Sequence, residues 1–141
     1  MTTLLSSERA QRVGLVTVIV LALALYAPSL FYGFTYDDHR NILGNEGVTG
    51  PFSLTAIFLR DAWGNAFSSA HNLGLFRPLV TLTFWVDRHL AGGAAWPFHL
   101  TNLSLFALVV WAADRLLRRF ALAPVARLSA LLLFAVLAIH A

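Results

Sequence analysis

The sequence predicts an all-α membrane protein with three transmembrane helices and one long extracytoplasmic loop that carries short interfacial amphipathic helices. Two observations support this fold class. Of the 141 residues, 58% are hydrophobic and only 12% are charged, which is too little charge for a soluble domain of this length. The apolar residues also gather into long runs, each close to the roughly 20 residues that a helix needs to cross a bilayer.

The first predicted transmembrane helix covers residues 13–32, which contain no charged side chain. Arg9 and Arg12 precede this run, and excess arginine marks the cytoplasmic end of a span, so residues 1–12 are expected in the cytoplasm. The alternative is a signal peptide that uses the same arginines as its positive region. The uncleaved helix is favoured because the apolar run continues past the small residues at which a signal peptidase would cut.

Two further spans are predicted at residues 98–120 and 122–141, and the short connection around Pro124 makes them an antiparallel pair. Arginines gather where the two spans adjoin and place that end in the cytoplasm: Arg115, Arg118, Arg119 and Arg127. Asp114 lies next to Arg115 near this end, and either a local ion pair with Arg115 or snorkelling is expected to accommodate it. The loop at 33–97 and the C-terminus would then face outward from the inner (cytoplasmic) membrane of the cell, with the lipid bilayer as a partner.

Charge and cysteine content narrow the possible functions. All ten basic residues are arginine, a usage typical of GC-rich bacterial genomes. A pI near 10.2 would suggest nucleic acid as a partner of a soluble protein. Here the arginines lie beside apolar segments, so they are interpreted as topology signals, and no nucleic-acid partner is expected. The chain contains no cysteine, which excludes disulfides and thiolate metal sites.

The loop is rich in aromatic and aliphatic residues that are interrupted by single charges. Residues 52–67 and 76–90 are both predicted to form short amphipathic helices in the membrane interface. Glycine and proline separate the two segments from their neighbours. Trp63, Trp85 and Trp96 fit the aromatic belt that membrane proteins place at this depth.

The densest polar cluster opens the loop, where Asp37 and Asp38 follow the first span in the stretch "YDDHRNILGN". A pair of carboxylates at a membrane surface can act as a general base on an acceptor hydroxyl, or it can hold a divalent cation that neutralises a phosphate. The simpler interpretation is that Tyr-Asp-Asp forms a solvated capping turn without catalytic function. No other metal site is assigned, and a divalent cation at this pair is the only cofactor considered.

Four stretches together resemble the start of the membrane-embedded GT-C glycosyltransferases: "YDDHRNILGN", "DAWG", "FRPLVTLTFWVDRHL" and "FHLTNLSLFAL". The sequence is most similar to the O-mannosyltransferase type that carries tetratricopeptide repeats after its membrane part. The resemblance implies a polyprenyl- or dolichyl-phosphate sugar as donor and a hydroxyl group as acceptor. It also implies an essential acid in the first outer loop, so that Asp37 would be catalytic and Asp38 its partner.

Several other side chains become candidates through the same resemblance. Arg77 matches the aromatic-Arg-Pro-Leu stretch and could grip the donor phosphate, with Arg40 as an alternative. Either arginine could instead anchor an interfacial helix. His99 and Asn102 could line the site or simply bond between helices. His140 matches one histidine of the family pattern "FAVHPIHTE", which here is "FAVLAIHA".

The resemblance implies a limited role for this chain alone, because GT-C enzymes contain many more membrane helices than three. We therefore expect the N-terminal part of a transferase that moves a mannose-like sugar and is inactive alone. The remaining C-terminal part, or another membrane subunit, would be its partner. The alternative is a small non-enzymatic membrane protein, or a degenerate remnant, that binds lipid phosphate or a protein.

Overall fold

The structure, a computed structural model, describes residues 2–71, 74–120 and 122–137. All regular elements in these residues are helical, apart from an isolated β-bridge between Arg60 and Ala66. The chain divides into two compact units. The helical unit consists of Met1–Ser29 and Asn102–Ala141, and the loop unit consists of Leu30–Thr101.

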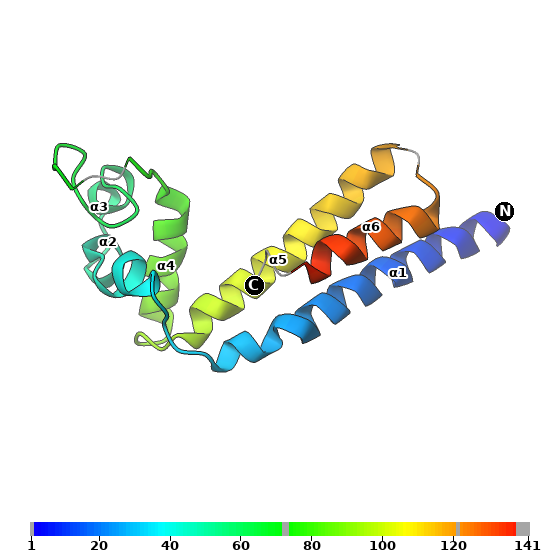
Figure 1. Ribbon diagram of the computed structural model, residues 1–141, viewed down its shortest axis with the longest axis horizontal. Helices are drawn as coiled ribbons and strands as arrows, with labels where there is room; N and C mark the ends of the chain where they lie inside the picture. The colour runs from blue at the N-terminus through cyan, green and yellow to red at the C-terminus, as the bar shows by residue number, and fades with distance from the viewer. Residues whose placement is uncertain (1, 72–73, 121, 138–141) are drawn as a thin grey trace. The chain divides into compact units, whose positions relative to one another are not determined.

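The helical unit is built from long apolar helices (Figure 1). Helix α1 covers Thr2–Tyr26 and continues as a 3-10 helix, η1, over Ala27–Phe31. Helix α5 begins at Trp96 in the loop unit, ends at Leu117 and continues as the 3-10 helix η3 (Arg118–Phe120). Helix α6 covers Pro124–Val136, runs antiparallel to α5 and lies along α1 (Figure 1).

The prediction of three spans is wrong for the third of them. In the described residues, two helical segments are long and apolar enough to cross a membrane: Glu8–Phe31 and Trp96–Phe120. Helix α6 contains 13 residues, so it is about 20 Å long, whereas the hydrocarbon core of a bilayer is about 30 Å thick. Proline at its first turn and the extended backbone of Leu137 after its last residue set these bounds.

The core of the helical unit consists of small and branched side chains from all three helices. Buried residues of this core are Val18, Ala22, Val110, Leu131 and Ala135. Gly14 of α1 lies against Leu128 of α6, and a Cβ atom at Gly14 would come within 2.6 Å of the Leu128 Cδ1 atom. Small residues permit such close approach between helices that cannot rely on water to drive them together.

A buried ionic network joins the same three helices. Asp114 of α5 is fully buried and accepts a hydrogen bond of 2.7 Å from Nε of Arg118. Its other oxygen lies 3.1 Å from Nε of Arg127 in α6, an ion pair without hydrogen-bond alignment. Both guanidinium groups donate to Oε1 of Gln11 in α1. Arg115, the expected partner of Asp114, instead lies over the Trp111 ring at 5.7 Å.

In the described residues of the loop unit, four helical elements lie between η1 and α5. A π-helix, η2, covers His39–Leu43, and α2 covers Glu46–Thr49. Helix α3 covers Leu54–Phe58, and α4 covers Pro78–Leu90. The buried core of this unit is formed by Ile42, Val48 and Phe98, with Phe34 and Phe84 packed against them.

The two predicted loop helices have different outcomes. The second is present as α4, which begins with Pro78 at its first turn. The first is helical only over Leu54–Phe58 and not over the whole of residues 52–67. Asp61 ends it, because the carboxylate Oδ1 accepts the backbone N–H groups of Trp63 and Asn65 at 2.9 and 2.8 Å and thereby stabilises a turn.

Candidate functional site

The acid pair lies in a turn directly before η2, and its two members have different surroundings. Oδ2 of Asp38 accepts hydrogen bonds from Thr35 N at 2.8 Å and from Thr35 Oγ1 at 3.3 Å. Within the described part of the chain, the exposed side chain of Asp37 has no hydrogen bond or ion pair. Asp38 therefore has the turn-forming role of the simpler interpretation, and the carboxylate of Asp37 remains open to a ligand.

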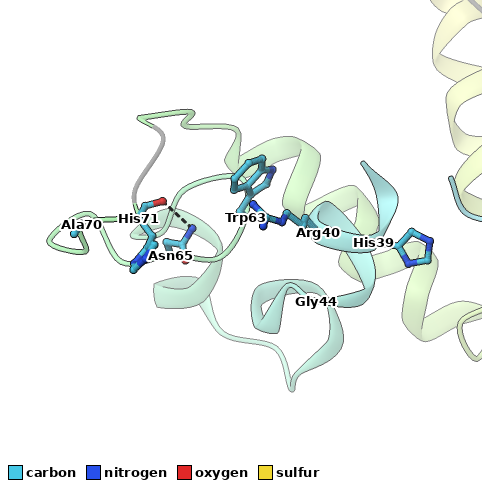
Figure 2. Close-up of a pocket in the computed structure, with 7 residues that line it drawn as sticks. All are labelled: His39, Arg40, Gly44, Trp63, Asn65, Ala70 and His71. Carbon is cyan, nitrogen blue, oxygen red and sulfur yellow. Dashed lines mark hydrogen bonds between the residues drawn. The ribbon is translucent and has the colours of Figure 1, made fainter. Parts of the chain in front are cut away.

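The same turn starts the helix that positions Arg40. The carbonyl of Asp37 accepts the N–H groups of Arg40 and Asn41 at 3.2 and 2.9 Å. A π-helix pairs residues five apart in the chain, and single π-helical turns are frequent at functional sites. The Arg40 guanidinium lies over the Trp63 ring, with its Cζ atom 4.6 Å from the ring centroid. Figure 2 shows this pair, with the His39 ring directed away from it.

Arg40 and Trp63 belong to the wall of a pocket of about 450 Å³. The complete lining consists of His39, Arg40, Gly44, Trp63, Asn65, Ala70 and His71 (Figure 2). Aromatic, cationic and amide groups converge here, and the volume is within the range of small-molecule sites. The acid pair does not line this pocket, but it lies in the turn that begins the Arg40 helix.

Asn45 fixes the two walls of the pocket to each other. Its side chain is 1% exposed, and its amide Nδ2 donates to the carbonyl of Ala62 at 3.1 Å, which links the start of α2 to the turn that carries Trp63. Its Oδ1 accepts from Gly47 N at 2.8 Å. Gly64, with φ of +79°, lies against Asn45, and a Cβ at Gly64 would come within 2.6 Å of that oxygen.

Arg77 is exposed and lies at a different cavity from Arg40. It precedes α4 and borders a crevice of about 60 Å³ whose other lining residues are Asn41, Ala62, Val80, Thr81 and Phe84. The Arg77 carbonyl accepts hydrogen bonds from Thr81 N and Thr81 Oγ1. The two predicted phosphate ligands therefore border separate cavities of the loop unit.

The predicted lining residues of α5 have varied environments. His99 is half-buried, and its Nε2 atom is buried without a hydrogen-bond partner in the described part of the chain. Asn102 is exposed. His140 lies outside the described residues. Nearby on the same helix, Thr101 Oγ1 donates to Oδ1 of Asp87 at 2.7 Å, whereas the second oxygen of this buried carboxylate has no partner among the described residues.

Burial raises the pKa of the Asp87 carboxyl above its ordinary value of 3.8, and the hydrogen bond from Thr101 partly offsets this effect. The neutral acid is then favoured in the folded state. Stability from this group is greatest below pH 3.8 and is lost as the pH rises through the raised pKa. Asp87→Asn should therefore unfold less readily than wild type at pH 7, but should match it near pH 3.5. Denaturant titrations at both pH values test this, and equal stability at pH 7 would contradict it.

The described residues contain no group of three or more histidine, aspartate or glutamate side chains that could hold a metal ion. A divalent cation at Asp37 and Asp38 could take the open carboxylate and the Oδ1 atom of Asp38, and a magnesium ion commonly uses one or two carboxylates with water and substrate phosphate. A cation at the two acids would therefore need water or a substrate phosphate for the rest of its ligands.

Sequence patterns alone do not mark Trp63, Asn65 and His71 as residues of one pocket. Trp63 was assigned to the interfacial aromatic belt, but it forms the stacking surface for Arg40. The available signal was local: Asp61 and Asn65 around a Trp-Gly pair are typical of a side-chain-stabilised turn. Pairing this turn with Arg40 required the fold.

The chain was compared with known proteins. It is 37% identical over 121 residues to the protein O-mannosyl-transferase Tmtc2 of Drosophila melanogaster, an alignment that covers 85% of this chain and 13% of the relative. It is 36% identical over 128 residues to Tmtc1 of the same organism, covering 90% of this chain and 15% of the relative. TMTC3 of Mus musculus is 36% identical over 126 residues, with 89% and 14% coverage.

No family model and no solved structure matches the chain. The chain spans about one seventh of the length of the curated relatives it matches. Two apolar helices of membrane-spanning length and these relatives together indicate a membrane protein. The predicted resemblance is thus confirmed: over most of its length, the chain is homologous to one segment of the protein O-mannosyl-transferases.

Proposed function

We propose that this chain forms the N-terminal membrane part of a GT-C glycosyltransferase that moves a mannose-like sugar from a polyprenyl-phosphate donor to a hydroxyl acceptor. The observation that carries this proposal is the difference between the two acids. Asp38 is occupied by Thr35, whereas Asp37 presents an exposed carboxylate with no partner in the described residues. An exposed, unoccupied base at the start of the loop is what proton abstraction from an acceptor requires.

The proposed reaction is a single inverting displacement. The acceptor oxygen attacks the anomeric carbon of the sugar while its proton passes to the Asp37 carboxylate. The bond between the anomeric carbon and the phosphate oxygen breaks, and its electron pair leaves with the polyprenyl phosphate. An arginine of the loop unit, Arg40 or Arg77, balances the phosphate charge. His99 and Asn102 are retained as candidate lining residues.

Catalysis also needs the donor and acceptor to be held together, a term worth about 7–11 kcal/mol of the barrier. Because the chain spans only 13% of the Drosophila Tmtc2 relative, we propose that further membrane segments supply this enclosure, either as a continuation or as another subunit. A chimera tests the function. Residues 26–136 would replace the matching segment of that relative, and the chimera should transfer mannose to a protein acceptor in isolated membranes. A chimera that inserts normally but does not transfer contradicts the proposal.

The proposed topology places the N-terminus in the cytoplasm, the loop unit outside the inner membrane and the connection between α5 and α6 in the cytoplasm. Since the chain has no cysteine, single cysteines report on each side without background. Ser68→Cys should react with an impermeant maleimide in intact cells, and Ala123→Cys should react only after the membrane is opened. The reverse pattern would move Asp37 to the cytoplasm and remove its access to an extracytoplasmic acceptor.

A further inference from the structure

We infer that the pocket formed by Arg40, Trp63, Asn65 and His71 binds the sugar–phosphodiester headgroup of the donor, with Arg40 as the phosphate ligand. This inference rests on the proposed transfer reaction and names the place where its donor binds. Arg40 lies over the Trp63 ring and both residues line the pocket, whereas Asp37, Asp38 and Arg77 do not line it.

Stacking orients the Arg40 guanidinium without using its hydrogen-bond donors. With Cζ 4.6 Å from the Trp63 centroid, the guanidinium group lies over the face of the ring, a contact that uses none of its N–H groups as hydrogen-bond donors to an oxygen. The five N–H groups of arginine point outward in the plane of the group, and two of them can bind two oxygens of one anion. No protein acceptor in the described residues engages the Arg40 side chain. The N–H groups of the Arg40 guanidinium are therefore oriented by Trp63 and available to an anion.

The charge of the pocket selects the type of anion. Among the described residues that line it, Arg40 is the one with a permanent charge, and none carries a carboxylate. Asp61, the nearest acid in the chain to Trp63, directs its Oδ1 atom to the backbone of the turn. One guanidinium matches a phosphodiester, which carries a single negative charge shared by two non-bridging oxygens. This is the headgroup chemistry of a lipid-linked sugar, whereas a free phosphate at neutral pH carries more charge than one arginine balances.

Asn65 and His71, on another wall of the pocket, provide hydrogen-bond acceptors for sugar hydroxyl groups. Nδ2 of Asn65 donates to Oδ2 of Asp61 and to the carbonyl of His71, both at 3.3 Å, so that Oδ1 of Asn65 remains available. The His71 backbone N–H donates to Oγ of Ser69 at 3.2 Å, and within the described part of the chain the His71 imidazole has no hydrogen bond, so it can contact a ligand. Figure 2 shows Asn65 and His71 on the side of the pocket opposite His39. A volume of about 450 Å³ is compatible with one sugar ring and its phosphate.

The position of Arg40 relative to Asp37 favours it over Arg77 for this role. The Arg40 backbone N–H donates to the Asp37 carbonyl, so the proposed base and the phosphate ligand belong to one turn. Arg77 borders a crevice of about 60 Å³, much smaller than the 450 Å³ pocket. Trp63 is a positioning residue in this scheme, because it acts on the phosphate through Arg40.

Binding to the purified full chain in nanodiscs tests the inference without turnover. The probe is a short-chain polyprenyl phosphomannose, and its affinity is measured by isothermal titration. Arg40→Ala should weaken binding about 10–100-fold, the range expected for charge-assisted hydrogen bonds. The matched control Arg77→Ala should change it less than about threefold. Arg40→Lys keeps the charge but loses the fork, and should recover only part of the loss. Circular dichroism of each variant confirms that the chain remains folded.

The role of Trp63 has its own readout. Trp63→Leu should weaken binding of the phosphomannose probe, and Trp63→Phe, which retains a stacking ring, should restore most of the affinity. Neither change should alter the weak binding of the matching polyprenol, which has no phosphate. If Trp63→Leu and Trp63→Phe weaken binding equally, the tryptophan has a purely structural role and does not orient Arg40.

The source of the phosphate is decided by competition. Inorganic phosphate should displace the probe only at concentrations at least 100-fold higher than unlabelled phosphomannose. Displacement at similar concentrations identifies a free-phosphate site and overturns the headgroup assignment. If the affinity depends on Arg77 and not on Arg40, the pocket assignment is wrong, and transfer by the chimera would still support the proposed function.

If binding depends on Arg40 but a well-inserted chimera does not transfer mannose, the pocket assignment stands and the proposed transfer reaction is wrong.

Discussion

Asp37→Asn is expected to lower the rate of sugar transfer by the chimera about 10²–10⁴-fold, the contribution typical of a general base. The asparagine is isosteric and keeps the turn, because the backbone carbonyl of residue 37, and not its side chain, accepts the N–H groups of Arg40 and Asn41. What it loses is the proton acceptor. Transfer of radiolabelled mannose to a protein acceptor, measured in membranes with equal amounts of chimera, gives the rate.

Asp38→Asn is the matched control for this substitution. Its side-chain oxygen can still accept from Thr35 N and Oγ1, so transfer should remain within about tenfold of the unmodified chimera. Binding of the phosphomannose probe should be unchanged in both variants, since neither acid lines the pocket. Full activity of Asp37→Asn would return Asp37 to a solvated turn residue. A larger loss in Asp38→Asn than in Asp37→Asn would exchange their roles.

Asp114→Ala is expected to destabilise the helical unit by about 3–5 kcal/mol, the cost of leaving one member of a buried ion pair without its partner. The carboxylate is fully buried, and the Arg127 residue that faces it is only 5% exposed. Removal of Asp114 would leave a guanidinium in a low-dielectric environment with Gln11 as its remaining hydrogen-bond partner. Titration with SDS in mild detergent micelles, followed by tryptophan fluorescence and circular dichroism, measures the loss.

Two variants separate this explanation from a general sensitivity of α5. Arg115→Ala changes the adjacent residue, which is exposed and contacts Trp111, and should cost less than about 1 kcal/mol. The double variant Asp114→Leu with Arg127→Met removes both buried charges and should recover most of the stability, because buried pairs can be replaced by apolar groups of similar volume. A double variant as unstable as Asp114→Ala would show that the ionic network itself is required.

The two predicted loop helices show where local sequence patterns are insufficient to predict helix length. Residues 78–90 of the predicted range 76–90 form α4, because Pro78 at the first turn and a regular apolar stripe agree on one helix. Residues 52–67 have a similar composition, yet Asp61 uses its carboxylate to hold the backbone of the following turn. An aspartate can stabilise a helix start or a turn, and its choice depends on the tertiary contacts that bury it. Here Asn45 donates to the Ala62 carbonyl and lies against Gly64, and so fixes the turn that Asp61 begins.

Ion pairing shows the same limit for the helical unit. Sequence proximity predicted Arg115 as the partner of Asp114, because adjacent opposite charges are the simplest pair. On a helix, adjacent residues point about 100° apart, whereas residues four apart share a face. Arg118 therefore takes one oxygen of Asp114, and Arg127 reaches the other from α6. The arginines expected only to mark the cytoplasmic side also hold the helices together.

The sequence by itself determined the all-helical membrane class, the two long apolar helices, the family and the acid pair, because long apolar runs and local motifs depend on residues close in the chain. The structure was needed to show that α6 ends before it spans a bilayer and that Asp38 is occupied while Asp37 is open, and tertiary contacts alone decided that Arg40 lies on Trp63. Arg40 and Trp63 meet across 22 intervening residues of the chain through Asn45 and Ala62. Such pairing depends on burial and long-range hydrogen bonds, which no local pattern encodes.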